Sequence, residues 1–146
     1  MARKLKKRRP KTQRRKTWDA CSLYIRLRDA VEYQKKHPDT PFGYVKCCTC
    51  PRIVIYNKNA DAGHCISRGS RGGSGVYFDE RNINTQCKPC NGFEGGRVEI
   101  HKAFIVEKYG QIMDELEFLD ANHIYRPYDL IGLELFYKQK YEELLR

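Results

Sequence analysis

The sequence predicts an α+β protein in which a zinc-stabilised core of short strands lies between an N-terminal helix and C-terminal helices. Three observations support this fold class. Two C-x-x-C pairs, Cys47/Cys50 and Cys87/Cys90, enclose a segment that contains β-branched and aromatic residues. Apolar residues at three- and four-residue spacing precede and follow this segment, which is the pattern of amphipathic helices. With 146 residues, 40% of them hydrophobic, the chain is long enough for one domain.

The first 16 residues form a basic tail. They contain ten Lys or Arg and no Asp or Glu, which leaves 18 basic and 18 acidic side chains in the other 130 residues. The net charge of +10 is therefore concentrated in this tail. Because such a segment repels itself, we expect residues 1–16 to be disordered and to add salt-sensitive affinity for the phosphates of a nucleic acid.

Residues 17–38 are expected to form the N-terminal helix. Thr17 is the expected N-cap, and Pro38 lies at the far end. The apolar residues of this segment recur at helical spacing and are expected to pack in the core: Trp18, Cys21, Tyr24, Ile25, Leu27, Val31 and Tyr33. A linker with two prolines and a glycine, HPDTPFG, follows.

Residues 43–97 are expected to form the core. They read as strand, metal knuckle, strand, turn and strand, because RIVIY (52–56) is β-branched and aromatic and NKNADAG supplies the reversal. A glycine- and serine-rich loop, 67–75, then leads through VYFDERNINTQ to the second cysteine pair.

Residues 98–146 predict a C-terminal helical region. Its first apolar face is expected to break near Gly110, and a last helix is expected from about Pro127 to Leu145. No apolar run reaches the roughly 18 residues of a membrane span, and no apolar segment of a signal peptide follows the basic N-terminus. We therefore expect a cytoplasmic protein with no membrane partner.

Four of the seven cysteines predict a structural zinc site. An odd number of cysteines argues against a closed disulfide framework, whereas two C-x-x-C turns suit tetrahedral Zn²⁺ in a reducing compartment. Cys47, Cys50, Cys87 and Cys90 are the expected ligands. Cys48 could form a C-x-C pair with Cys50, but this is a poorer bite, so Cys47 is preferred. A redox-active dithiol is the alternative interpretation, although neither pair follows a βαβ pattern.

Three polar residues accompany the second cysteine pair in a recognisable order. His64 lies within the enclosed segment, Asn82 lies five residues before Cys87, and Asn91 directly follows Cys90. This order, H…N-x(4)-C-x-x-C-N, resembles the HNH nucleases, whose ββα-metal fold places a β-hairpin and a helix around one divalent cation. The resemblance implies an HNH-like core in which His64 and Asn82 are catalytic. The simpler interpretation is that His64 only makes hydrogen bonds within a zinc domain.

The chemistry of phosphodiester hydrolysis explains why these residue types are needed. A neutral imidazole with a pKa of about 6.5 deprotonates water near neutral pH, which makes His64 the candidate general base. Mg²⁺ or Mn²⁺ takes oxygen ligands and stabilises the developing charge, and Asn91 is a candidate ligand. Asp61 stands in a D-A-G-H element that resembles the D-R-G-H element of the DNA/RNA non-specific ββα-metal nucleases, and it is either a second ligand or a brace of the hairpin. Gly63 occupies the position where many HNH proteins have an acidic residue.

Longer stretches resemble the NinG (Rap) family of phage recombination endonucleases. These stretches are YIRLRDA (24–30), GYVKCCTC (43–50), DAGHCISRG (61–69), FDERNINTQCKPCN (78–91) and VEKYG (106–110). The resemblance covers about residues 18–120 and implies a structure-selective, divalent-metal-dependent DNA endonuclease that acts on Holliday junctions and D-loops. It gives His64, Asn82 and Asn91 the family's active-site places and the four cysteines its zinc places. The chain departs from the family at Arg97, where an asparagine is common, and in the additional cysteine of CCTC.

Basic residues beside these motifs are expected to bind branched DNA, mainly through its phosphates, although ordinary solvated loops would look the same: Arg68, Arg71, Arg81, Lys88 and Arg97. Two other functions stay open, namely a general HNH nicking endonuclease without branch preference and a non-catalytic zinc-dependent DNA-binding module. A homodimer would suit paired nicks across a junction, with the last helix as its interface. His37, His101 and His123 are expected to be structural or surface residues.

Overall fold

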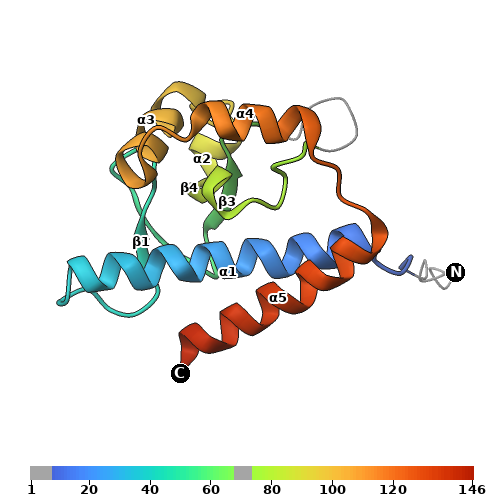
Figure 1. Cartoon of the computed structure of the whole chain (residues 1–146). Helices are drawn as coiled ribbons and strands as arrows, with labels where there is room; N and C mark the ends of the chain where they lie inside the picture. The colour runs from blue at the N-terminus through green and yellow to red at the C-terminus, as the bar shows by residue number, and fades with distance from the viewer. Residues whose placement is uncertain (1–7, 68–73) are drawn as a thin grey trace, which may run out of the picture.

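The computed structural model of the chain describes residues 8–67 and 74–146, and Figure 1 shows the arrangement of its elements. Arg68 and Arg71, which we expected to bind DNA, lie outside these ranges. The fold is a mixed α+β arrangement of helices and two small sheets. In chain order its elements are α1 (Gln13–Lys36), β1 (Tyr44–Lys46), β2 (Ile53–Ile55), β3 (Ala60–His64), the 3₁₀ helix η1 (Glu80–Asn82), β4 (Ile83–Cys87), α2 (Lys88–Asn91), α3 (Val98–Tyr109), α4 (Met113–Asn122) and α5 (Pro127–Leu145).

Helix α1 begins earlier than the sequence predicts. Thr12, not Thr17, is its N-cap, because the Thr12 hydroxyl oxygen accepts a hydrogen bond from the backbone N–H of Arg15 at 3.2 Å. Thr17 is buried inside the helix, and its hydroxyl donates to the carbonyl oxygen of Leu130 at 2.7 Å. Residues 13–16, which we assigned to the basic tail, therefore belong to the helix.

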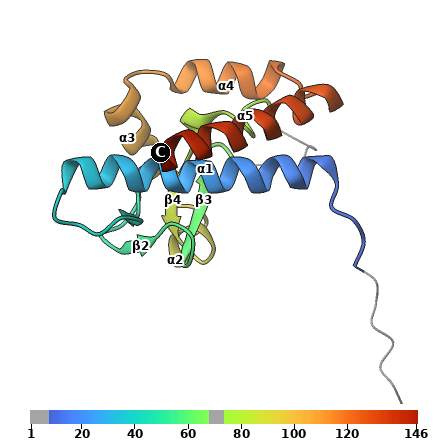
Figure 2. The same ribbon diagram turned by 90° about the horizontal axis from the view of Figure 1, so that it is seen from below.

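Two antiparallel hairpins supply the strands. β1 pairs with β2, and β3 pairs with β4 over the register Ala60↔Cys87 to His64↔Ile83. The first C-x-x-C turn connects β1 to β2, and the second begins at the last residue of β4. In the view from below, β2 and α2 lie on one side of α1, whereas α3 and α4 lie on the other (Figure 2).

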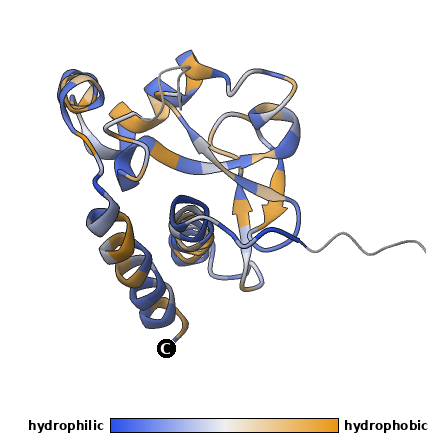
Figure 3. Cartoon of the chain, turned by 90° about the vertical axis from the view of Figure 1, so that its right-hand side faces the viewer, coloured by the Kyte–Doolittle hydropathy of each residue, from blue (hydrophilic) through white to orange (hydrophobic). Residues whose placement is uncertain are grey.

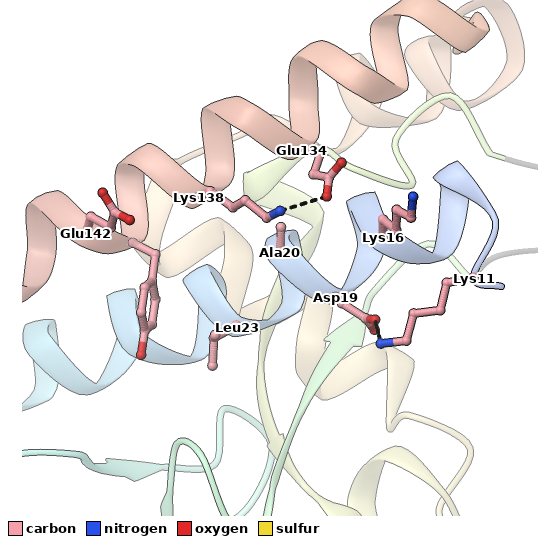
Figure 4. A pocket seen from close by; sticks show the side chains of 9 residues that line it. Lys11, Lys16, Asp19, Ala20, Leu23, Glu134, Lys138 and Glu142 are labelled. Atoms are coloured by element: carbon pink, nitrogen blue, oxygen red, sulfur yellow. Dashed lines mark hydrogen bonds and ion pairs between the residues drawn. The ribbon is translucent and has the colours of Figure 1, made fainter. Parts of the chain in front are cut away.

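Helices α1 and α5 lie side by side and form one of the apolar clusters of the core (Figure 1). Tyr137 of α5 is almost completely buried, and its hydroxyl donates to the carbonyl oxygen of Phe78. Hydrophilic and hydrophobic segments alternate along α5, whose C-terminal end is marked in Figure 3. A cavity of about 370 Å³ lies between the two helices, where Lys138 pairs with Glu134 at 2.9 Å (Figure 4).

The C-terminal helices follow the predicted pattern. α3 ends at Tyr109, directly before Gly110, whose positive φ of 85° suits glycine, and α4 begins at Met113. The last helix runs from Pro127 to Leu145, as expected. Within the described residues, no helix combines the length and the apolar character that a membrane crossing requires.

Candidate functional site

The four cysteines of the two C-x-x-C turns meet in one cluster. The Sγ atoms of Cys47, Cys50, Cys87 and Cys90 all lie within 4.8 Å of one another. Four thiolates at this separation can bind a structural metal such as Zn²⁺, and a site with four protein ligands has no open position for a substrate. Because β1 and β4 lead directly into these turns, a metal bound here would join the two hairpins.

Cys48 is not part of the cluster, which agrees with the preference for Cys47. The backbone N–H of Cys48 donates to the carbonyl oxygen of Thr85 at 3.0 Å. Burial, reinforced by the neighbouring Cys47, raises the pKa of the Cys48 thiol. A positive charge lies instead beside a cluster thiol, since the guanidinium of Arg52 is 3.8 Å from the Cys87 Sγ.

Asp61 and Asn91, the expected ligands of a catalytic cation, lie together beside this cluster. The Asn91 side-chain amide donates to the Asp61 carboxylate at 3.2 Å. The other Asp61 oxygen accepts from Lys88 at 2.7 Å. Asn91 directly follows the buried Cys90 in α2, so the cysteine cluster fixes its position against β3.

A polar cavity of about 400 Å³ opens at Asp61. One wall belongs to α1, of which only the apolar residues, Trp18 among them, were expected to have a role, as part of the core. Trp18, Ser22 and Arg26 are four residues apart, so they share one face of the helix. No sequence signal shows that this face meets β3. The lining residues are Trp18, Ser22, Arg26, Lys58, Ala60, Asp61, Ala62, Lys88 and Asn91.

His64 is not among the lining residues of this cavity, but it contacts one of them, Trp18, and it is held on two sides. Its ring stacks on Trp18 with 4.7 Å between ring centroids and 26° between planes, and it also contacts the ring of Tyr77. Its Nε2 is 2.8 Å from the carbonyl oxygen of Tyr77. Because a carbonyl oxygen only accepts hydrogen bonds, Nε2 carries a proton, and the neutral ring then has its lone pair on Nδ1.

The side chain of Asn82 is fully buried, and within residues 8–67 and 74–146 its hydrogen bonds go to main-chain groups. Its Oδ1 accepts from the N–H of Ile66 at 2.8 Å, and its Nδ2 donates to the carbonyl oxygens of Ile66 (3.1 Å) and Val76 (3.2 Å). These contacts join the two ends of the loop that follows His64. These bonds hold the loop in position, and the catalytic role expected for Asn82 stays a prediction.

Gly63 directly precedes His64, and the structure explains the glycine. A Cβ atom at this position would lie 1.9 Å from Oε1 of Gln86. The Gln86 side chain is buried, and its Nε2 donates to the Thr49 hydroxyl (3.0 Å) and to the Gly96 carbonyl oxygen (2.9 Å). The hairpin therefore has no room for a side chain directly before His64.

Three of the expected DNA-binding residues, Arg81, Lys88 and Arg97, differ in whether they line the cavity or pair with nearby carboxylates. Lys88 lines the cavity. Arg81 is held by Asp79 at 2.9 Å and Glu115 at 3.1 Å, and its hydrogen bond to Asp79 raises its pKa. Arg97 precedes α3 with a φ of 45° and approaches Glu94 at 3.7 Å. Of these three residues, only Lys88 lines the cavity beside Asp61.

A buried polar network lies behind the hairpin. Arg28 donates to Oδ1 of Asn84 at 3.2 Å, so the Asn84 amide nitrogen faces Nε2 of His101 at 3.0 Å. Burial, together with the nearby His64, lowers the pKa of His101 to about 4. His101 is therefore a neutral structural residue near neutral pH, in agreement with the structural role expected for it.

The comparisons with known proteins agree on one family. Residues 2–146 match the family described as "Bacteriophage Lambda NinG protein". Protein ninG of Salmonella phage P22 is 28% identical over 126 residues, which are 86% of this chain and 54% of that protein. Protein ninG of Escherichia phage lambda is 27% identical over 126 residues, with 86% and 53% of the two chains covered.

The chain spans about half the length of these curated relatives. No solved structure gave a significant match. Since the family match extends over nearly the whole chain, the protein belongs to the NinG family.

Proposed function

We propose that this protein is a divalent-metal-dependent DNA endonuclease with an HNH-like ββα-metal core, acting on branched recombination intermediates such as Holliday junctions and D-loops. The observation that carries the proposal is the convergence of Asp61 and Asn91 at one polar cavity, with Trp18 linking that cavity to His64. Branch preference comes from the family resemblance, and the chemistry comes from the site.

Asp61 and Asn91 would hold the catalytic cation. A carboxylate and an amide offer the oxygen ligands that Mg²⁺ and Mn²⁺ prefer, so the residues fit the group. When bound, the cation would supply charge stabilisation at the phosphodiester and its departing oxygen. The cysteine cluster is separate in ligand chemistry, because thiolates favour zinc.

His64 is the general base of the proposed reaction. The Tyr77 carbonyl oxygen holds Nε2 as the protonated nitrogen, so Nδ1 is the atom that takes a proton from water. The resulting hydroxide attacks phosphorus, the bond to the 3′ oxygen breaks, and the departing oxygen takes a proton from water, so the products carry 5′-phosphate and 3′-hydroxyl ends. Asn82 contributes indirectly, by fixing the loop that begins directly after His64 and Cys65.

The test compares cleavage of a mobile four-way junction with cleavage of a linear duplex of the same sequence, with and without Mg²⁺ or Mn²⁺. His64→Ala should abolish cleavage while zinc content and junction binding stay at the wild-type level. His37→Ala is the matched control, since His37 is an exposed histidine that contacts Tyr33 at the end of α1. Full activity of His64→Ala would refute the proposed base.

The same experiment separates the other two functions. Equal cleavage of junction and duplex would indicate a general HNH nicking endonuclease. Zinc-dependent DNA binding without cleavage under any metal condition would indicate a non-catalytic DNA-binding module.

A further inference from the structure

Helix α1 forms a wall of the polar cavity with residues outside the HNH pattern. Trp18, Ser22 and Arg26 are four residues apart and line the cavity that also contains Asp61. Eight helical residues span about 12 Å along the axis. One strand of duplex DNA has a phosphate about every 3.4 Å of axis. The wall is therefore long enough to follow a few nucleotides of one strand.

The cavity carries an excess of positive charge. Its lining contains the cations Arg26, Lys58 and Lys88 but a single carboxylate, that of Asp61. Lys88 is paired with this carboxylate at 2.7 Å. Over residues 8–67 and 74–146, no carboxylate oxygen lies within 4.0 Å of a side-chain nitrogen of Arg26 or Lys58. Two cations thus remain for an anionic ligand.

The guanidinium of Arg26 is held by two hydrogen bonds to main-chain oxygens, which occupy part of its N–H donors. Its Nε donates to the carbonyl oxygen of Ser22 at 3.1 Å, and its Nη1 donates to that of Tyr56 at 2.7 Å. Burial lowers the pKa of Arg26, with Asp61 opposing the shift, but a guanidinium stays protonated at neutral pH. Since a guanidinium has five N–H donors, the two bonds leave donors available for a ligand.

We infer that this cavity binds the phosphodiester backbone of one nucleic-acid strand, with Arg26 and Lys58 as its phosphate contacts. A volume of about 400 Å³ lies in the usual range of small-ligand sites, so it suits a nucleotide-sized segment rather than a whole duplex. The inference rests on the proposed function in one respect, that the bound strand is the one that would be cleaved. Binding itself does not depend on cleavage.

The test measures the affinity of a labelled four-way junction as a function of salt, in the His64→Ala background. Loss of one phosphate contact reduces the slope of log K against log salt by about 0.7 to 0.9. Lys58→Ala should show this reduction, which corresponds to a roughly threefold smaller loss of affinity between about 50 and 200 mM salt. Arg26→Gln should behave similarly, and Arg26→Lys should keep most of the slope.

Lys35→Ala is the matched control, because Lys35 is an exposed lysine at the other end of α1. It should retain the parental slope. If Arg26→Gln fails to fold, Lys58→Ala still decides the inference, since the Lys58 side chain is exposed. Unchanged slopes in Lys58→Ala and in folded Arg26 variants would overturn it.

The outcomes for the cavity and for the nuclease are separable. A wild-type protein that cleaves DNA, combined with parental slopes in the variants, refutes the phosphate-binding cavity and leaves the endonuclease standing. A wild-type protein that never cleaves, combined with reduced slopes, supports the cavity and refutes the endonuclease.

Discussion

Replacing Gly63 by alanine tests whether the buried Gln86 amide excludes a side chain before His64. The new Cβ would lie 1.9 Å from Gln86 Oε1, so the Gln86 side chain must move. Moving it breaks two hydrogen bonds, to Thr49 and Gly96, which contribute about 0.5–1.5 kcal/mol each. Overpacking adds about 1–3 kcal/mol. We expect Gly63→Ala to lower the free energy of unfolding by about 2 to 6 kcal/mol.

The assay is urea unfolding at a fixed excess of Zn²⁺, followed by the fluorescence of Trp18, which is the one tryptophan of the chain. In the Gln86→Ala background the obstructing amide is absent, so Gly63→Ala should cost at least about 1.5 kcal/mol less than in the wild type. Gly132→Ala in α5 is the control. A Cβ there meets no atom within 4 Å, and alanine should stabilise the helix by about 0.5–1 kcal/mol. Equal costs of Gly63→Ala in the two backgrounds would refute the steric explanation.

Three further predictions concern the cysteine cluster, the loop clamp and a buried histidine. Cys87→Ala should lose the bound zinc and much of the fold, whereas Cys48→Ser should keep one zinc per chain; a zinc assay on both variants decides. Asn82→Ala removes three side-chain hydrogen bonds and should lower the free energy of unfolding by about 2–4 kcal/mol, and a loss below about 0.5 kcal/mol would contradict the clamp. His101 has a pKa near 4 when folded, against 6.5 ordinarily, so the unfolded chain binds the proton more tightly. The contribution of neutral His101 to the free energy of unfolding is therefore complete above about pH 6.5, and it falls by about 3 kcal/mol as the pH drops toward 4. The difference in unfolding free energy between wild type and His101→Gln should follow this window, and a pH-independent difference would count against it.

The local features of the fold could be predicted because their causes are local in sequence. Cys47 and Cys50 share one turn, and so do Cys87 and Cys90, so spacing alone indicates the cluster. The break at Gly110 follows from a backbone conformation that glycine readily adopts.

The features that the sequence could not indicate depend on contacts between residues that are distant in sequence. Thr12 and Thr17 are equally good caps by residue type, and the fold distinguishes them because Thr17 bonds to Leu130, 113 residues away. The DNA-binding role expected for Arg81 stays a prediction, but no sequence signal indicates that Glu115 pairs with it across 34 residues. Arg26 faces the candidate site only because α1 packs against β3.

The clamp formed by Asn82 has a consequence for the segment between its two anchor points. One side chain pins both Ile66 and Val76, so the chain on either side of the intervening segment has the same anchor points whatever lies between them. The entropic cost of a longer loop grows only slowly with its length. Insertions or deletions between residues 66 and 76 should therefore leave His64 in place.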